Sequence, residues 1–317
     1  MPHHRLPDAG GPLPYAGEPL TTTVPRQYVH RAAVAEVFLT GWEETGPHAF
    51  TVRAQWPRGH SLFRAAGGHQ DPLLIAETIR QAGSLLSHAA YGVPLGHQFL
   101  MWDLAFSASP EAVAVAPAPT DLELHVTCRD VAQRRGELTK MRYTASVVRD
   151  GRPVATGGAS FNCVTPAAYR RLRGERPFFP SGAMPPPVAP GLVGRELERD
   201  VVLAAPTGDA GTHRWELRVD TGHPVLFDHP VDHVPGMVLL EAARQAAQAV
   251  SSRRILPVAV STVYENYAEF DAPCWIEATP GAPDALGRPT VEVTGRQADR
   301  TVFTSTVTAW PASRTPA

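Results

Sequence analysis

The chain has 317 residues, which at roughly 150 residues per domain corresponds to two domains or one large one. Hydrophobic residues make up 43% of it and charged residues 19%, as in soluble globular proteins, which excludes wholesale disorder and a fibrous repeat. The 29 basic residues nearly balance the 31 acidic ones, so the chain lacks the basic excess that generic nucleic-acid binding requires.

The chain is expected to be soluble and cytoplasmic. Residues 1–20 lack the apolar core of a signal peptide and are predicted to form a mobile tail. No apolar run reaches the roughly 18 residues of a membrane span. The three cysteines are far apart and form no Cys-x-x-Cys pair, so neither a disulfide framework nor a zinc site is indicated. No metal or cofactor is predicted.

A Pro- and Gly-rich segment divides the sequence into two similar halves. Residues 172–190 show no helical or strand periodicity and are typical of a linker. We therefore predict an N-terminal domain at 21–171 and a C-terminal domain at 191–317.

Each half is predicted to contain strands, one buried helix and then an antiparallel meander. In the first half, strands are expected at 28–39, 49–55, 98–107, 122–128, 139–148 and 153–164, the last two joined by the turn Asp150-Gly151. In the second half, strands are expected at 200–203, 212–219, 258–264, 274–278, 290–295 and 301–309.

The helix of each half carries the same polar motif. Glu-x-x-Arg-Gln occurs as Glu77, Arg80 and Gln81, and again, at one constant offset along the chain, as Glu241, Arg244 and Gln245. At 3.6 residues per turn the three polar side chains fall on one face of an otherwise apolar helix. Asp71 is positioned to cap the first of these helices. The repeat predicts two related helices, each with one polar stripe.

A curved antiparallel sheet wrapped around one helix resembles the hotdog fold, and two copies resemble an α+β double hotdog. In the second copy, His229 precedes Pro235-Gly236, and Glu241 and Gln245 follow on the helix. This segment resembles the active site of the β-hydroxyacyl carrier-protein dehydratases, although the loop after His229 is shorter here.

The whole chain more closely resembles the A-factor biosynthesis (AfsA) family of actinobacterial γ-butyrolactone synthases, through segments 29–42, 71–83 and 228–245. The resemblance implies an acyltransferase that joins a β-ketoacyl group to the hydroxyl of dihydroxyacetone phosphate, the first step toward a γ-butyrolactone or butenolide signal. The implied donor is a thioester of acyl carrier protein, with acyl-CoA as the other candidate.

This chemistry needs a base, donors for an oxyanion and a cation for the phosphate. Glu77 and Glu241 are candidate bases, because a carboxylate on an apolar helix is desolvated and its pKa is expected to rise toward neutrality. Arg80 and Arg244 are expected to bind the phosphate or, alternatively, to neutralise the glutamates. Gln81 and Gln245 are further candidate ligands for the substrate.

The starts of the two helices are the expected oxyanion sites, through backbone N–H groups near Leu73 and at Gly236 and Met237. His229 is a third catalytic candidate, which we expect to face Glu77 across an internal pseudo-dimer interface. His60 or His69 is a candidate counterpart of His229 in the first half.

Several alternatives remain open from the sequence. In one of them, one half carries the activity while the other is vestigial. The spacing of Asp228, His229, Asp232 and His233 resembles a metal site, but it lies in a Pro-rich loop and no metal is expected. A hotdog dehydratase or thioesterase would use the same Glu and His without a phosphate, and a non-catalytic regulatory member would need neither glutamate.

Overall fold

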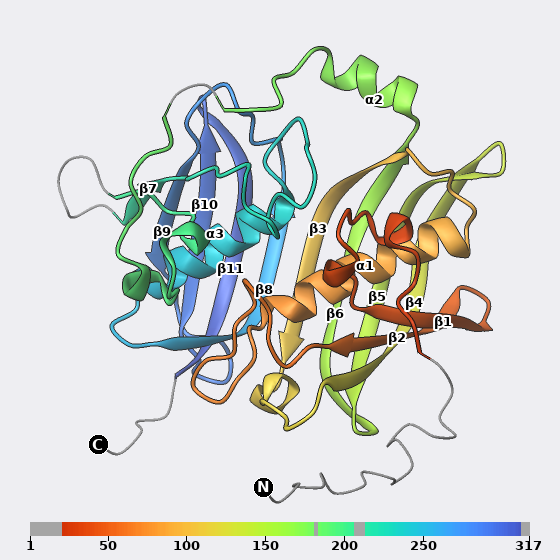
Figure 1. Ribbon diagram of the computed structural model, residues 1–317, viewed down its shortest axis with the longest axis horizontal. Helices are drawn as coiled ribbons and strands as arrows, with labels where there is room; N and C mark the ends of the chain where they lie inside the picture. The colour runs from red at the N-terminus through yellow and green to blue at the C-terminus, as the bar shows by residue number, and fades with distance from the viewer. Residues whose placement is uncertain (1–20, 181–182, 206–212, 312–317) are drawn as a thin grey trace, which may run out of the picture.

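The described part of the chain forms one curved antiparallel sheet of 11 strands that holds two long helices (Figure 1). The computed structural model describes residues 21–180, 183–205 and 213–311, so the predicted tail at 1–20 lies outside the described residues. The strand order is β1-β2-β4-β5-β6-β3-β8-β11-β10-β9-β7.

The first half contributes six strands and the helix α1 (Leu73–Ala89). Its strands are β1 (Leu39–Gly46), β2 (Ala49–Trp56), β3 (Gln98–Ala108), β4 (Thr120–Arg134), β5 (Glu137–Arg149) and β6 (Arg152–Val164). The second half contributes α3 (Gly236–Ala249) and five strands, β7 (Arg214–Glu216), β8 (Ile255–Tyr264), β9 (Trp275–Pro280), β10 (Thr290–Gln297) and β11 (Arg300–Pro311). The predicted double hotdog is therefore confirmed.

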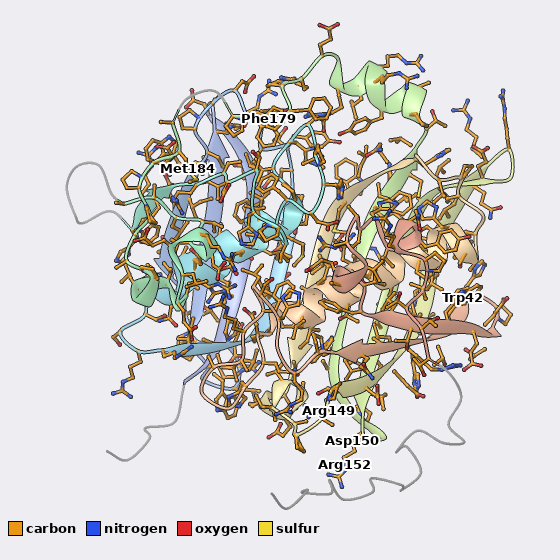
Figure 2. All side chains as sticks on the ribbon, in the orientation of Figure 1. Trp42, Arg149, Asp150, Arg152, Phe179 and Met184 are labelled. Atoms are coloured by element: carbon orange, nitrogen blue, oxygen red, sulfur yellow. The ribbon has the colours of Figure 1, made fainter. Side chains whose placement is uncertain are left out.

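The two halves meet where β3 pairs with β8, from Asp103↔Val263 to Ser107↔Ala259. The sheet is consequently continuous across the molecule, and α1 and α3 lie beside one another on it (Figure 1). Between the halves the chain runs through a short helix, α2 (Pro166–Arg173), and past the exposed side chains of Phe179 and Met184 (Figure 2). The domain boundaries drawn from the sequence remain predictions.

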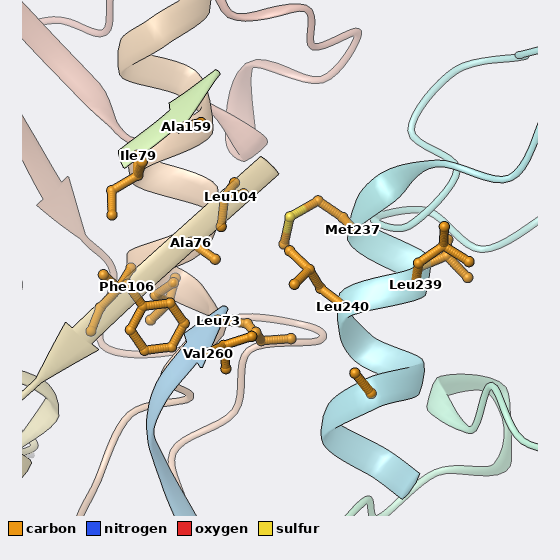
Figure 3. Packing of buried hydrophobic residues seen from close by; sticks show 14 of the residues in the cluster. Leu73, Ala76, Ile79, Leu104, Phe106, Ala159, Met237, Leu239, Leu240 and Val260 are labelled. Atoms are coloured by element: carbon orange, nitrogen blue, oxygen red, sulfur yellow. The ribbon is translucent and has the colours of Figure 1, made fainter. Parts of the chain in front are cut away.

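Both long helices are buried because apolar residues cover most of their surface. Figure 3 shows Ala76 and Ile79 of α1 against Leu104 of β3 and Ala159 of β6. Each fully buried apolar side chain of this size, such as Ile79, contributes roughly 1.5–3 kcal/mol to folding. In the described part of the chain, no helix is long and apolar enough to cross a membrane.

Gly83 lets α1 approach the sheet closely. A Cβ at this position would lie 2.6 Å from the ring of Tyr143 on β5, well inside van der Waals contact. The Tyr143 hydroxyl donates a hydrogen bond of 2.6 Å to the carbonyl of Ile79 on the same helix. The aromatic ring therefore occupies the space that any larger residue at 83 would need.

The Asp150-Gly151 turn predicted from the sequence joins β5 and β6. Arg149 pairs with Arg152 at the end of the ladder, with Asp150 between them in the turn (Figure 2). Asp150 and Gly151 have φ of 50° and 72°. Two consecutive positive φ values are typical of the tight turn that suits the twist of a hairpin. The Asp-Gly pair thus fixes the register of these strands.

The strand predicted at 28–39 is wrong. This segment forms two 3-10 turns, Arg26–Val29 and Val34–Glu36, and β1 begins only at Leu39. The reason is that side chains of α1 satisfy its backbone in place of a neighbouring strand. The carbonyls of Val29 and Glu36 accept hydrogen bonds from the side chains of Arg80 and Gln81.

Candidate functional site

Glu77 lies at the centre of a buried ionic cluster in the first half. Its carboxylate accepts hydrogen bonds from Arg31, with Nε at 3.0 Å, and from Arg80, with Nε at 2.8 Å and Nη2 at 2.7 Å. A fourth bond of 2.7 Å comes from the side-chain amide of Gln81. The Glu77 side chain is 1% exposed, whereas those of Arg31 and Arg80 are 8% and 16% exposed.

Glu241 repeats this cluster in the second half. Arg195 donates to it from Nε at 2.7 Å and from Nη2 at 2.5 Å, and Arg244 donates from Nε at 2.9 Å and from Nη2 at 2.7 Å. Arg195 follows Arg31 at the same offset that separates the two Glu-x-x-Arg-Gln motifs. Neither of these additional arginines belongs to the Glu-x-x-Arg-Gln motif, so neither was predicted from it.

The expectation that burial raises the pKa of Glu77 and Glu241 is wrong. Burial opposes ionisation of both, but the two arginines beside each carboxylate outweigh it and lower the pKa of each to about 2. Each glutamate is therefore ionised at neutral pH and holds two guanidinium groups in place. A carboxylate of this kind is a poor proton acceptor.

The side chains of the two glutamines in the motif form hydrogen bonds with backbone groups and do not line the pockets described here. Gln81 donates to the carbonyl of Glu36 at 2.7 Å and accepts from the N–H of Phe38 at 3.0 Å. Gln245 makes the same pair of contacts with the carbonyl of Asp200 and the N–H of Val202. The structure therefore brings neither glutamine to a position open to substrate.

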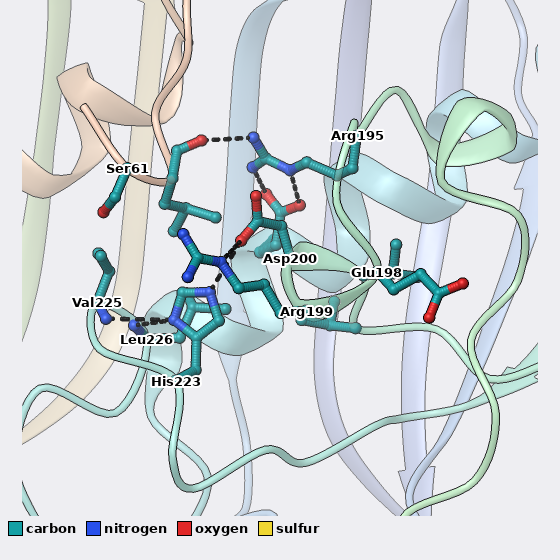
Figure 4. Close-up of polar contacts among 12 residues, drawn as sticks. Ser61, Arg195, Glu198, Arg199, Asp200, His223, Val225 and Leu226 are labelled. Atoms are coloured by element: carbon teal, nitrogen blue, oxygen red, sulfur yellow. Dashed lines mark hydrogen bonds and ion pairs between the residues drawn. The ribbon is translucent and has the colours of Figure 1, made fainter. Parts of the chain in front are cut away.

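His60 has a counterpart in the second half, but it is His223 and not His229. Nδ1 of His60 accepts from two consecutive backbone N–H groups, and its Nε2 lies 3.3 Å from the carboxylate of Glu36. His223 makes the same contacts with two backbone N–H groups and with Asp200 (Figure 4). Both histidines therefore have a structural role in fixing loops.

A pocket with a volume of about 510 Å³ lies between the halves. The first half supplies polar groups from His30, Arg31 and Arg80. The second half supplies the loop 226–231 and the start of α3. Much of the remaining wall is apolar and includes Phe99, Leu100, Met101, Trp102, Leu104, Phe161 and Leu239. The pocket thus joins an apolar chamber to two guanidinium groups.

His229 lines this pocket, and its side chain is 44% exposed. Its Nδ1 lies 3.4 Å from the carboxylate of Asp228. That carboxylate also accepts from the backbone N–H groups of Ala32 and Ala33, at 2.5 and 3.0 Å, so the loop of the second half is fixed to the first half. His229 does not touch Glu77, whose four hydrogen bonds go to its own half of the chain.

The start of α3 faces the same pocket with free backbone donors. No side chain caps this helix, and its first hydrogen bond runs from the N–H of Val238 to the carbonyl of Pro235. Among the described residues, the N–H groups of Gly236 and Met237 have no acceptor, and both residues line the pocket. These two N–H groups are therefore available where the sequence predicts oxyanion donors, and that role stays a prediction.

The corresponding place in the other half is closed by Asp71. Its carboxylate accepts from the N–H of Leu73, which caps α1 as expected and removes the oxyanion donor predicted there. The same carboxylate binds Nη1 of Arg195 at 2.9 Å. The position equivalent to Asp71 in the second half is Pro235, so Arg31 has no such second acid. The pocket beside Arg195 and Arg244 has a volume of only about 70 Å³.

Asp232 and His233, which share a metal-like spacing with His229, are engaged elsewhere. Asp232 accepts from Tyr169 at 2.7 Å and from Arg173 at 3.1 Å, and it lies 2.7 Å from Nδ1 of His233. Among residues 21–180, 183–205 and 213–311, no group of three or more His, Cys, Asp or Glu side chains is placed to hold a metal ion.

Two further residues that line the pocket were not predicted from the sequence. Tyr264 donates a hydrogen bond of 3.3 Å to the carbonyl of Gly236 at the start of α3. The hydroxyl of Tyr267 is buried without a partner among the described residues, although the residue lines the pocket. Neither lies in a repeated or charged motif, so no pattern in the sequence distinguishes them from core aromatics.

The fold and the pocket together define a double-hotdog protein in which both halves line a largely apolar pocket. The chain belongs to the A-factor biosynthesis hotdog family, whose pattern it matches over residues 15–165 and 181–313.

Relatives of this chain carry a specific name. A protein of Streptomyces virginiae named 2-oxo-3-(phosphooxy)propyl 3-oxoalkanoate synthase is 55% identical over 290 residues, which cover 90% of this chain and 96% of the relative. A protein of the same name from Streptomyces coelicolor is 42% identical over 90% of each chain. Among solved structures, a putative oleoyl thioesterase from Lactobacillus plantarum matches 83% of this chain and 95% of its own, with a TM-score of 0.52 and 11% identity, which shows the shared fold.

Proposed function

We propose that this protein is a 2-oxo-3-(phosphooxy)propyl 3-oxoalkanoate synthase, an acyltransferase that joins a 3-oxoacyl group to a hydroxyl of dihydroxyacetone phosphate. The relatives that carry this name support the activity. The observation that carries the site is the pocket between the halves, which combines apolar walls with Arg31, Arg80 and His229. The apolar chamber suits an acyl chain of several carbons.

Arg80 is the proposed phosphate ligand. Its Nε and Nη2 are held by Glu77, while Nη1 has no acceptor within the described residues and the side chain lines the pocket. A guanidinium pre-oriented by a carboxylate presents its remaining N–H groups in a fixed direction, which suits a phosphate oxygen. Glu77 acts in this proposal as a positioning residue for Arg31 and Arg80.

His229 is the proposed general base, oriented by Asp228. It takes the proton of the acceptor hydroxyl as the alcohol oxygen attacks the thioester carbonyl carbon. The carbon–sulfur bond then breaks, and the imidazolium returns the proton to the leaving thiolate. The products are the ester and a free thiol, so no other reactant is needed.

The backbone N–H groups of Gly236 and Met237 are the proposed oxyanion donors. They lie at the N-terminus of a 14-residue helix, where the free N–H groups and the helix dipole favour negative charge. Because Gly236 has no side chain, the thioester carbonyl can approach the first turn closely.

We also propose that the halves act as an internal pseudo-dimer with one active site. The working site takes its arginines from the first half and its histidine and helix start from the second. At the equivalent place, Asp71 satisfies both the start of α1 and the Nη1 group of Arg195. Glu241 and Arg244 then have a structural role.

An acyl carrier protein is the proposed donor, and α2 is the proposed contact. Tyr169 and Leu172 of this helix line the pocket, and Arg170 and Arg171 beside them are exposed. Neither arginine forms an ion pair with any described residue. Carrier proteins are acidic, so two unpaired arginines beside the pocket give charge complementarity with such a partner.

Reconstitution tests the function directly. Purified protein, a 3-oxoacyl carrier-protein thioester and dihydroxyacetone phosphate should give the phosphorylated ester by mass spectrometry, together with one thiol per ester. Thiol release without dihydroxyacetone phosphate, and with no ester when it is added, would instead identify a thioesterase.

A further inference from the structure

His30 has a backbone conformation that its counterpart in the other half adopts with glycine. It ends the 3-10 turn Arg26–Val29 with φ of 54° and ψ of 51°. The matching turn in the second half, Pro190–Val193, lies at the constant offset between the halves and ends at Gly194 with φ of 67°. A residue with a Cβ is disfavoured in this left-handed region, and glycine is not. The first half therefore keeps a histidine side chain where glycine would suit the backbone better.

That side chain is directed into the pocket. The ring of His30 lines it and packs on Phe99, with ring centroids 4.6 Å apart. In the other half Gly194 has no side chain, and the space beside it holds Gln248 and Arg244. Residues with a disfavoured backbone conformation cluster at functional sites, so such a residue in a pocket wall is a candidate for a functional role.

A second histidine sets the protonation of the ring. Nε2 of His30 lies 2.8 Å from Nε2 of His88, and Nδ1 of His88 lies 2.7 Å from the carbonyl of Val93. The carbonyl can only accept, so Nδ1 of His88 carries a proton. Because burial lowers the pKa of His88, its ring is neutral and its Nε2 accepts. We assign the proton on Nε2 of His30 accordingly, which leaves a lone pair on its Nδ1.

The lone pair stays available across the physiological pH range. Burial, with further contributions from Arg80, His88 and His229, lowers the pKa of His30 to about 3. No hydrogen bond to Nδ1 is made within the described residues. The pocket wall thus contains a neutral, oriented acceptor close to the proposed phosphate ligand and base.

We propose that Nδ1 of His30 accepts a hydrogen bond from the hydroxyl of the phosphorylated acceptor when this substrate binds. The hydrogen bond holds the hydroxyl in place, and its single proton passes to His229 only as the alcohol oxygen attacks the acyl donor. The inference rests on the proposed acyl transfer and adds a residue to it. With Arg80 holding the phosphate end, His30 fixes the opposite, reacting end of the acceptor. His88 is a positioning residue, because it acts only through the tautomer of His30.

The test compares steady-state ester formation in three variants with the wild type. His30→Gly removes the acceptor and relieves the backbone, so we expect the KM for dihydroxyacetone phosphate to rise at least about tenfold while the KM for the acyl donor stays within about twofold. His30→Asn places an amide oxygen near the position of Nδ1 and tolerates the backbone, so it should stay within about threefold of the wild type. His48→Gly is the matched control: His48 also has a positive φ, 57°, but it is exposed in the β1–β2 turn, and both KM values should be unchanged.

Each outcome decides a separate point. No ester from the wild type would reject the proposed function itself. An active wild type with an unchanged acceptor KM in His30→Gly, or an equal rise in His30→Gly and His30→Asn, would overturn the role of His30. If His30→Gly does not fold, His88→Phe replaces it, since a phenyl ring keeps the stacking on Phe99 but cannot fix the tautomer. The proposal then requires a higher acceptor KM in His88→Phe, and a wild-type value would reject it.

Discussion

Replacing Glu77 by glutamine should destabilise the protein strongly at neutral pH. The change leaves Arg31 and Arg80 buried with an amide in place of their shared carboxylate, and breaking a buried ion pair in this way typically costs about 3–5 kcal/mol. The pKa of Glu77 gives a similar magnitude. A decrease from 4.5 to about 2 corresponds to about 3 kcal/mol of stabilisation by the ionised form, at about 1.4 kcal/mol per pH unit.

The stabilisation that ionised Glu77 provides depends on pH. The folded pKa of Glu77 lies below the unfolded one, so its carboxylate stabilises the protein fully above pH 4.5 and loses this effect as pH falls toward 2. The gap in unfolding free energy between wild type and Glu77→Gln should therefore narrow below pH 4.5, because the unfolded wild type binds a proton at Glu77 that the unfolded Glu77→Gln variant cannot bind.

Urea denaturation followed by circular dichroism at pH 7, 5, 4 and 3 measures this gap. Glu241→Gln is the matched comparison, since the pKa of Glu241 is also lowered to about 2 by two arginines. It should lose similar stability. A gap below about 1 kcal/mol at pH 7, or one that stays constant down to pH 3, would refute the ionic account of these clusters.

Three further outcomes follow from the geometry. His229→Gln should lower kcat for ester formation by about 10²–10⁴ with little change in melting temperature, because the side chain is 44% exposed, and retention of kcat would remove it as the base. The double change Arg170→Glu and Arg171→Glu should raise the KM for a carrier-protein thioester but not for the matching coenzyme A thioester, and equal effects on both donors would contradict docking at α2. Gly83→Ala should cost about 1–3 kcal/mol in a urea melt, because its Cβ would overlap the ring of Tyr143, and a neutral effect would show that the helix can move away.

Much of the fold could be predicted because its signals are local. The helices follow from apolar runs that contain one polar stripe, and the strands of each meander follow from alternation and from the Asp150-Gly151 turn. The strand placed at 28–39 failed because side chains of Arg80 and Gln81, distant in sequence, satisfy that backbone. Periodicity carries no information about such a partner.

Only part of each ionic cluster could be predicted from the sequence, for the same reason. The Glu-x-x-Arg motif shows one arginine beside each glutamate, but the second arginine comes from 46 residues away, and with it the direction of the pKa shift reverses. The constant offset between the halves does contain this signal, since it pairs Arg31 with Arg195. The proposed choice between the halves rests on Asp71 and Pro235, and the sequence does not show what this difference does until the starts of the two helices are compared in space.

The most direct test of the central claim is the KM for dihydroxyacetone phosphate in Arg80→Met and Arg244→Met. Both changes remove a buried arginine from the same motif, and KM does not depend on the fraction of enzyme that is folded. If only the pocket beside Arg80 works, Arg80→Met should raise this KM by about 10–100-fold, as expected for a lost hydrogen bond to a charged group, and Arg244→Met should leave it unchanged. A similar rise in both variants, or a rise in Arg244→Met alone, would contradict the single site proposed between the halves.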